Sequence, residues 1–300
     1  ACDWGDLPES GTSFATTGTN NGARHNISDA IRLGALIDPE PDGQPTTAAN
    51  GDDTNNPNNN PSDEDGLASL PPLPITTASY SLQVAVTNIT GNPATLYGWI
   101  DWDGNNSFEP AEIQTATVSG NGSATSATLT WTGVRVSPGT TRYARLRFTT
   151  FPLNDDVNTP ADERARGIAS DGEVEDYLLS AAPLGSLTVI KNAVGGNDSF
   201  SFNATGLLPF TLSTTHGTAQ RTFTGLLPGN YSVTELLSPA WDLTSATCTG
   251  GKDPNSFLLA LSENVTCTFA NTKRASLTII KNTLYGNGTF DFVSQALNAF

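Results

Sequence analysis

Three polar residues stand at positions where apolar residues are expected in the C-terminal half of the chain. Each ends a short run of alternating apolar residues: Leu187, Val189 and Lys191; Tyr231, Val233 and Glu235; Cys267, Phe269 and Asn271. Because alternate residues of a β-strand point to the same face, Lys191, Glu235 and Asn271 are expected on the core-facing sides of three strands. A buried charge without a partner is costly, so the three are expected to cluster.

Two chemistries fit a buried lysine, glutamate and asparagine. One is non-covalent: Lys191 and Glu235 form a buried ion pair beside Asn271, or the three side chains lie near strand ends and reach solvent. The other is an autocatalytic isopeptide bond. Burial lowers the pKa of a lysine and raises that of a glutamate, so a neutral Lys191 amine could attack the Asn271 amide while Glu235 transfers protons and ammonia leaves.

An acidic segment in the N-terminal half has the spacing of a calcium loop. Oxygen-bearing residues occupy loop positions 1, 3, 5, 7 and 12, namely Asp101, Asp103, Asn105, Ser107 and Glu112. Ca²⁺ takes six to eight oxygen ligands, and alternate residues of a tight loop converge on one ion. Position 6, usually glycine, is Asn106, which tolerates a left-handed backbone better than most residues. The segment is predicted to bind calcium; a polar hairpin loop with solvated acids is the alternative.

Two further acidic clusters are weaker candidates for calcium. They contribute the residues Asp52, Asp53, Asp63, Asp65, Asp171 and Glu173. In the run 173–178, acids fall on both faces of a predicted strand, which requires that at least one of them be partnered by an arginine or a cation.

The cysteines indicate an oxidising compartment. Cys248 and Cys267 lie in one predicted domain and are expected to form a disulfide, and Cys2 is then either free or paired with another chain. The chain contains no Met, so Ala1 is not a translation start, and a removed secretory signal explains this most simply.

The elements that must position these residues are β-strands. Turn signals recur about every ten residues and helical patterns are scarce, which predicts an all-β protein. The resemblances to known families given below imply a β-sandwich-like N-terminal domain followed by Ig-like, prealbumin-like β-sandwich repeats. In the predicted strand 142–149, Arg145 and Arg147 alternate with apolar residues, which predicts a half-buried strand.

An internal repeat defines the domain organisation. Residues 186–210 and 276–300 are similar at a constant offset of 90 residues. We predict domains at 1–182 and 183–274, with 275–300 beginning a second, incomplete repeat. Either the missing strands follow in a longer array, or 276–300 completes a neighbouring subunit by strand addition.

Charge, hydropathy and the lack of catalytic motifs argue against several classes of function. Residues 1–182 carry 24 acids against 8 arginines, whereas residues 183–300 are neutral. Nucleic-acid binding needs a basic face, and no apolar run is long enough to span a membrane. No nucleophile elbow, phosphate loop or zinc spacing is present, so we do not expect an enzyme.

The first domain resembles the bacterial GEVED domain. The resemblance rests on residues 3–10, 22–25, 36–44, 63–66, Gly98-Trp-Ile-Asp-Trp102 and Ser170-Asp-Gly-Glu-Val-Glu-Asp-Tyr177. That family occurs in large secreted or cell-surface proteins, which implies an extracellular location.

The second domain resembles the collagen-adhesin B-type, prealbumin-like domains of bacterial pilins and adhesins. The matching segments are residues 187–192, 227–235 and 269–272. In that family, the residues matching Lys191, Glu235 and Asn271 form the isopeptide bond, although the cysteines could supply the staple instead.

Together these features predict a secreted structural protein that self-associates into a filament or stalk of stapled β-domains with calcium-stabilised loops. The alternative is a calcium-dependent adhesin for a glycan or another surface protein, in which Trp99, Trp102 and Trp131 present an aromatic surface.

Overall fold

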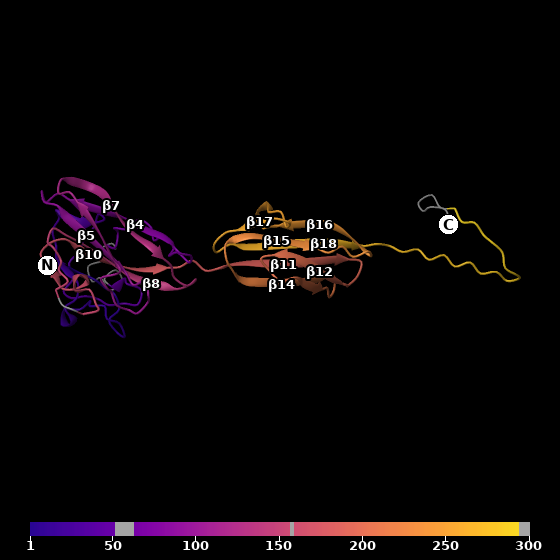
Figure 1. The fold of residues 1–300 in the computed structure, drawn as a ribbon, viewed down its shortest axis with the longest axis horizontal. Helices are drawn as coiled ribbons and strands as arrows, with labels where there is room; N and C mark the ends of the chain where they lie inside the picture. Colours follow the sequence, from indigo (N-terminus) through magenta and orange to yellow (C-terminus); the bar gives the residue numbers. More distant parts are fainter. Residues whose placement is uncertain (52–62, 157–158, 294–300) are drawn as a thin grey trace. The chain divides into compact units, whose positions relative to one another are not determined.

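The chain folds as two compact β-rich units in a computed structural model, which describes residues 1–51, 63–156 and 159–293 (Figure 1). One unit comprises residues 1–185 with 261–263, and the other comprises 186–260 with 264–300. The all-β prediction is confirmed. Three short 3-10 turns lie in the described residues: η1 (Gly18–Asn20), η2 (Glu163–Ala165) and η3 (Thr249–Gly251).

The described residues of the first unit form ten strands in three sheets. The strands are β1 (Cys2–Trp4), β2 (Arg24–Asn26), β3 (Ile31–Leu33), β4 (Ala78–Asn88), β5 (Ala94–Ile100), β6 (Ile113–Val118), β7 (Gly122–Val134), β8 (Thr141–Thr149), β9 (Ile168–Ala169) and β10 (Glu173–Ser180). The sheet orders are β10-β8-β5-β6, β3-β4-β7 and β1-β2-β9.

Two of these sheets form a sandwich around an apolar core. Alternate residues of β4, such as Leu82 and Val84, pack with residues of β5 and β8, such as Leu96 and Leu146, and all four are fully buried. This pattern is the period-2 alternation of a strand with one core face.

The other face of the β10-β8-β5-β6 sheet is also covered. Leu7, Phe14 and Phe108 form a second cluster with Trp99 of β5 on this side. Arg145 and Arg147 of β8 point to the same side and are completely buried. The prediction that this strand is half-buried is therefore wrong, because segments far away in the sequence cover its polar face.

The second unit is a sandwich of two four-stranded sheets. Its strands are β11 (Gly185–Val194), β12 (Ser199–Thr205), β13 (Phe210–Ser213), β14 (Thr218–Leu226), β15 (Gly229–Glu235), β16 (Trp241–Cys248), β17 (Phe257–Leu259) and β18 (Asn264–Lys273). The sheets have the orders β14-β11-β18-β16 and β13-β12-β15-β17, and enclose a core that includes Phe200, Phe202 and Phe269. Strands β11 and β18, the first and last of the unit, are neighbours and run parallel.

Residues 274–293 contain no helix or strand, although they are described. Leu277, Ile280 and Leu284 are 70 %, 78 % and 91 % exposed. The predicted second repeat therefore stays a prediction, and so does strand addition by 276–300, whose last seven residues lie outside the described part of the chain.

Candidate functional site

Three strands of the second unit bring Lys191, Glu235 and Asn271 into its core. Lys191 is paired in register with Phe269, and Ala193 with Asn271. Lys191 and Asn271 therefore lie on the same face of adjacent parallel strands, two register positions apart. Glu235 ends β15, which belongs to the opposite sheet, and so meets them across the core. The side chains of all three are buried, with exposed fractions of 0 %, 5 % and 1 % for Lys191, Glu235 and Asn271.

Glu235 contacts both of the other polar groups. Its Oε2 lies 3.1 Å from Lys191 Nζ, and its Oε1 accepts a short hydrogen bond from Asn271 Nδ2. Asn271 Oδ1 makes no hydrogen bond with any described residue. One carboxylate thus bridges an amine and the amide nitrogen that would leave if that amine attacked.

Burial makes the Lys191 amine easier to deprotonate than an exposed lysine. Burial lowers the pKa of the Lys191 amine, while the hydrogen bond and the charge of Glu235 oppose this shift. Lys191 Nζ also lies 4.4 Å from the centre of the Phe200 ring, so its environment is apolar apart from the carboxylate. A neutral amine is the form that can act as a nucleophile.

A disulfide joins two neighbouring strands of the same sandwich. Cys248 of β16 and Cys267 of β18 are register partners and are bonded through sulfur, as their positions in the sequence indicated. Cys267 lies on the core-facing side of β18 together with Phe269 and Asn271. Cys2 is a free, half-buried thiol.

The predicted calcium loop brings three of its five candidate ligands together. Single carboxylate oxygens of Asp101, Asp103 and Glu112 lie within 4.8 Å of one another. Asn106 has φ 63°, so the residue at the usual glycine position does adopt the left-handed conformation.

Hydrogen bonds within the loop hold these carboxylates in place. Asp101 accepts the backbone N–H groups of Gly104, Asn105 and Asn106 at 2.8–3.1 Å. Glu112 accepts that of Trp102 at 2.6 Å. The two remaining candidates are arranged differently: the Asn105 amide donates to Asp103 and Glu109, and the Ser107 backbone N–H donates to Asn105 Oδ1.

The loop carboxylates are electrostatically strained without a cation. Burial, followed by the hydrogen bond and the charge of the neighbouring Glu109, raises the pKa of Glu112 to about 8. Burial also raises the pKa of Asp101. A divalent cation would compensate these charges, as in oxygen-ligated calcium sites.

The weaker acidic candidates divide into three groups. Asp52 and Asp53 lie outside the described residues. Asp65 and Asp171 belong to neither acidic cluster of the described chain: Asp65 accepts the Ala35 N–H, and Asp171 accepts bonds from Thr149 and Thr150. Asp63 clusters with Asp3 and Glu40, which the sequence patterns did not single out, and Glu173 is buried near them.

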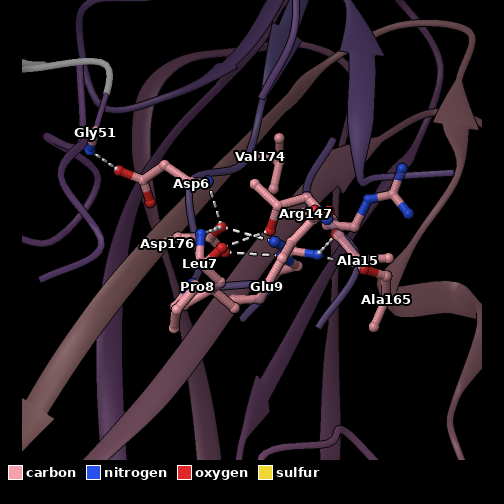
Figure 2. Close-up of polar contacts among 12 residues, drawn as sticks. Asp6, Leu7, Pro8, Glu9, Ala15, Gly51, Arg147, Ala165, Val174 and Asp176 are labelled. Carbon is pink, nitrogen blue, oxygen red and sulfur yellow. Dashed lines mark hydrogen bonds and ion pairs between the residues drawn. The ribbon is translucent and has the colours of Figure 1, made fainter. Parts of the chain in front are cut away.

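One acid of strand β10, Asp176, is partnered by an arginine, as the positions of acids on both faces of the strand required of at least one of them. Arg145 donates to Asp176 through Nε and Nη2, at 2.8 and 2.7 Å, in a fully buried ion pair. Asp176 also accepts the backbone N–H groups of Asp6 and Leu7, which lie against it in Figure 2. This carboxylate therefore ties the N-terminal segment to the sheet.

The second buried arginine depends on a neutral histidine. Arg147 Nε donates to His25 Nε2 at 2.9 Å, so the His25 proton is on Nδ1, which donates to the Asp171 carbonyl at 2.7 Å. Burial, followed by the charge of Arg147, holds the pKa of His25 well below its usual range. His25 is thus a structural hydrogen-bonding residue.

Two of the three tryptophans considered for sugar binding are in the core. Trp99 and Trp131 are 0 % and 2 % exposed, and both indole N–H groups are used, by Asp162 and the Glu112 carbonyl. Trp102 packs against the sandwich core and is half-buried. Trp99 and Trp131 therefore present no face to solvent.

Comparison with protein families identifies two domains. A model of the GEVED domain matches residues 95–180, and a model of a prealbumin-like fold domain matches residues 187–273. The chain therefore contains a GEVED domain followed by a prealbumin-like domain, as its motifs indicated. The GEVED match includes the segments Gly98–Trp102 and Ser170–Tyr177, whereas the similar segments before residue 95 lie outside it.

Two of the solved structures that match are remotely similar to this chain. The Bacillus anthracis TIE protein matches with 14 % identity and a TM-score of 0.25, over 68 % of this chain and 40 % of that one. The major pilin protein T3.2 of Streptococcus pyogenes matches with 12 % identity and a TM-score of 0.26, over 66 % of this chain and 98 % of the pilin. A search of characterised proteins found no match at the significance required.

The prealbumin-like domain supports a surface structural, pilus-like protein. Within the described residues, none of the helices has the length and apolar character needed to cross a membrane.

Proposed function

We propose that this chain is part of a secreted structural protein, a filament or stalk of the cell surface, whose prealbumin-like domain is stapled by an isopeptide bond between Lys191 and Asn271. The observation that carries this is the bridging position of Glu235, which contacts Lys191 Nζ with one oxygen and Asn271 Nδ2 with the other. The role is mechanical rather than enzymatic, because the bond forms once within the domain.

The reaction balances as an amide exchange. Neutral Lys191 Nζ attacks Asn271 Cγ, forming a C–N bond, and the bond from Cγ to Nδ2 breaks. Glu235 takes the proton that the attacking nitrogen loses and delivers it to the departing nitrogen, so that ammonia leaves. The product links adjacent parallel strands that begin and end the domain, so a pulling force along the chain bypasses the residues between them.

The test is the intact mass of the chain after reduction and denaturation. The wild-type chain is expected to be lighter than its sequence by one ammonia, and Glu235→Ala and Asn271→Ala are expected to have their full masses. Asn192→Ala is the matched control, because Asn192 precedes Ala193 on β11 but points away from the core. A wild-type chain of full mass would refute the bond and leave the disulfide as the staple of this domain.

Calcium is the second part of the proposal. The clustered oxygens of Asp101, Asp103 and Glu112 support one Ca²⁺ in the loop 101–112, where the ion would stabilise the connection between β5 and β6. Addition of calcium is expected to raise the melting temperature of the GEVED-containing unit, and Asp103→Asn with Glu112→Gln is expected to reduce that increase.

Filament formation and adhesion predict different experimental results. Self-association is expected to produce heavier species in the native material. Adhesion, the alternative, predicts retention on a glycan array that is lost when calcium is removed; such binding would replace the mechanical role as the main function.

A further inference from the structure

Four buried carboxylates of the first unit lie near one another where β1, the long connection before β4 and the start of β10 come together. They belong to Asp3 of β1, Glu40 and Asp63 of the long connection before β4, and Glu173 of β10; we call them the buried acidic cluster. Their exposed fractions are 2 %, 8 %, 5 % and 0 %. One carboxylate oxygen from each of Asp3, Glu40 and Asp63 lies within 4.8 Å of the others.

Each carboxylate of the cluster is anchored by a backbone N–H group through one of its two oxygens. The bonds are Val174 N to Asp3 Oδ2 at 2.7 Å, Trp4 N to Glu40 Oε2 at 2.9 Å, Asp38 N to Asp63 Oδ2 at 3.0 Å and Leu33 N to Glu173 Oε2 at 2.6 Å. The anchors fix the positions of the carboxylates but bring no positive side chain. Because Asp3 binds the N–H that follows Glu173, the two acids are held side by side.

Two further oxygens of the cluster are buried and have no hydrogen-bond partner among the described residues. They are Glu40 Oε1 and Glu173 Oε1. Neither Glu40 nor Glu173 forms an ion pair with a described lysine, arginine or histidine. A buried acceptor without a partner costs free energy that a folded protein normally avoids, so these two oxygens indicate a missing positive ligand.

The electrostatics agree with this interpretation. Burial, followed by the neighbouring Asp38 and Asp3, raises the pKa of Glu40 to about 11. Burial and the charges of Glu175, Asp3 and Asp63 raise the pKa of Glu173 well above its usual range. A divalent cation bound among these carboxylates would compensate their mutual repulsion.

We propose that Asp3, Glu40, Asp63 and Glu173 bind one calcium ion, separate from the ion of the loop 101–112. A cage made largely of carboxylate oxygens suits Ca²⁺ rather than Mg²⁺, which keeps several water ligands and is seldom enclosed by protein groups alone. The ion would join β1, the connection before β4 and β10, and so close the N-terminal segment over the sheet.

The test counts calcium ions bound per chain. The full chain is stripped with EDTA, dialysed against calcium chloride and analysed by atomic emission. The wild type is expected to bind one ion more than the Glu40→Gln/Glu173→Gln variant, and the loop variant Asp103→Asn/Glu112→Gln is expected to retain the ion of the cluster. Asp42→Asn is the matched control, since Asp42 is an exposed acid two residues beyond Glu40.

A melting experiment separates a binding site from a merely structural role. In EDTA, the Glu40→Gln/Glu173→Gln variant is expected to melt at or above the wild-type temperature, because two buried carboxyls have been removed. In calcium, the variant is expected to lose the increase that the cluster contributes to the wild type. A purely structural role for the glutamates predicts a lower melting temperature in both conditions.

Equal calcium in the wild type and the cluster variant would overturn the proposal. If that variant does not fold, the loop variant alone decides. One calcium ion retained by the loop variant supports the cluster, and a loop variant that retains no calcium refutes it. If the cluster variant binds one ion fewer than the wild type but the loop variant binds as many ions as the wild type, only the calcium loop of the proposed function is refuted.

Discussion

Removal of the Asp176 carboxylate should be among the most destabilising single changes in the first unit. Asp176 accepts two hydrogen bonds from Arg145 and two from the backbone of Asp6 and Leu7. In Asp176→Ala, Arg145 keeps its bonds to the carbonyls of Ala15 and Ala165 but loses its counter-charge while remaining buried.

The expected magnitude follows from this geometry. Breaking one side of a buried ion pair costs about 3–5 kcal/mol, whereas the unfolding free energy of a whole domain is about 5–15 kcal/mol. With a urea m-value of about 2 kcal/mol per molar, the unfolding midpoint should fall by roughly 2 M. The backbone N–H groups of Asp6 and Leu7 also lose their acceptor, so the N-terminal segment should detach first.

Urea unfolding followed by tryptophan fluorescence measures this effect. Four of the five tryptophans, at positions 4, 99, 102 and 131, are in the first unit, so the signal reports mainly on it. Arg166→Ala is the control, because the Arg166–Glu163 pair is partly exposed and should contribute about 1 kcal/mol or less. A loss below about 1 kcal/mol in Asp176→Ala would refute the view that this ion pair holds the segment to the sheet.

Two more predictions concern pH and the disulfide. Because the pKa of His25 is lowered in the folded state, only the unfolded chain takes up a proton on this residue as the pH falls below about 6.5. The free energy of unfolding is therefore unaffected by His25 above that pH and decreases below it, by up to about 1.4 kcal/mol per pH unit. Urea midpoints compared from pH 7 to pH 5 should show a smaller decrease in His25→Gln. Replacing both Cys248 and Cys267 with serine should lower the unfolding free energy of the second unit by about 3 kcal/mol, because the disulfide joins residues 19 apart in sequence. Calorimetry measures this change, and Cys2→Ser should leave the calorimetric transition of the second unit unchanged.

Sequence periodicity was sufficient to predict the side-chain directions of several strands. The alternation in β11, β15 and β18 placed Lys191, Glu235 and Asn271 on apolar faces, and all three are buried. The short strands β1, β2, β3 and β9, together with β6 and β16, were not predicted. Several of them have only two or three residues, too few for a periodic pattern to be recognised.

The acids of the first unit show where local patterns fail. The loop 101–112 was recognisable because its acids are close in sequence and regularly spaced. Asp3, Glu40 and Asp63 lie more than twenty residues apart in the sequence, and they come together only through the pairing of β1 and the course of the connection before β4.

The sequence by itself determined the all-β class, the two domains recognised by their motifs and the polar residues that interrupt apolar strand faces, because these depend on local alternation and spacing. Only the tertiary structure decided which of these residues meet. It placed Lys191 and Asn271 on adjacent parallel strands, and it buried Arg145 and Arg147 beneath the N-terminal segment. Burial of a polar face depends on chain segments more than a hundred residues away, as the Asp6–Asp176 contact with its separation of 170 residues shows, and no local pattern contains that information.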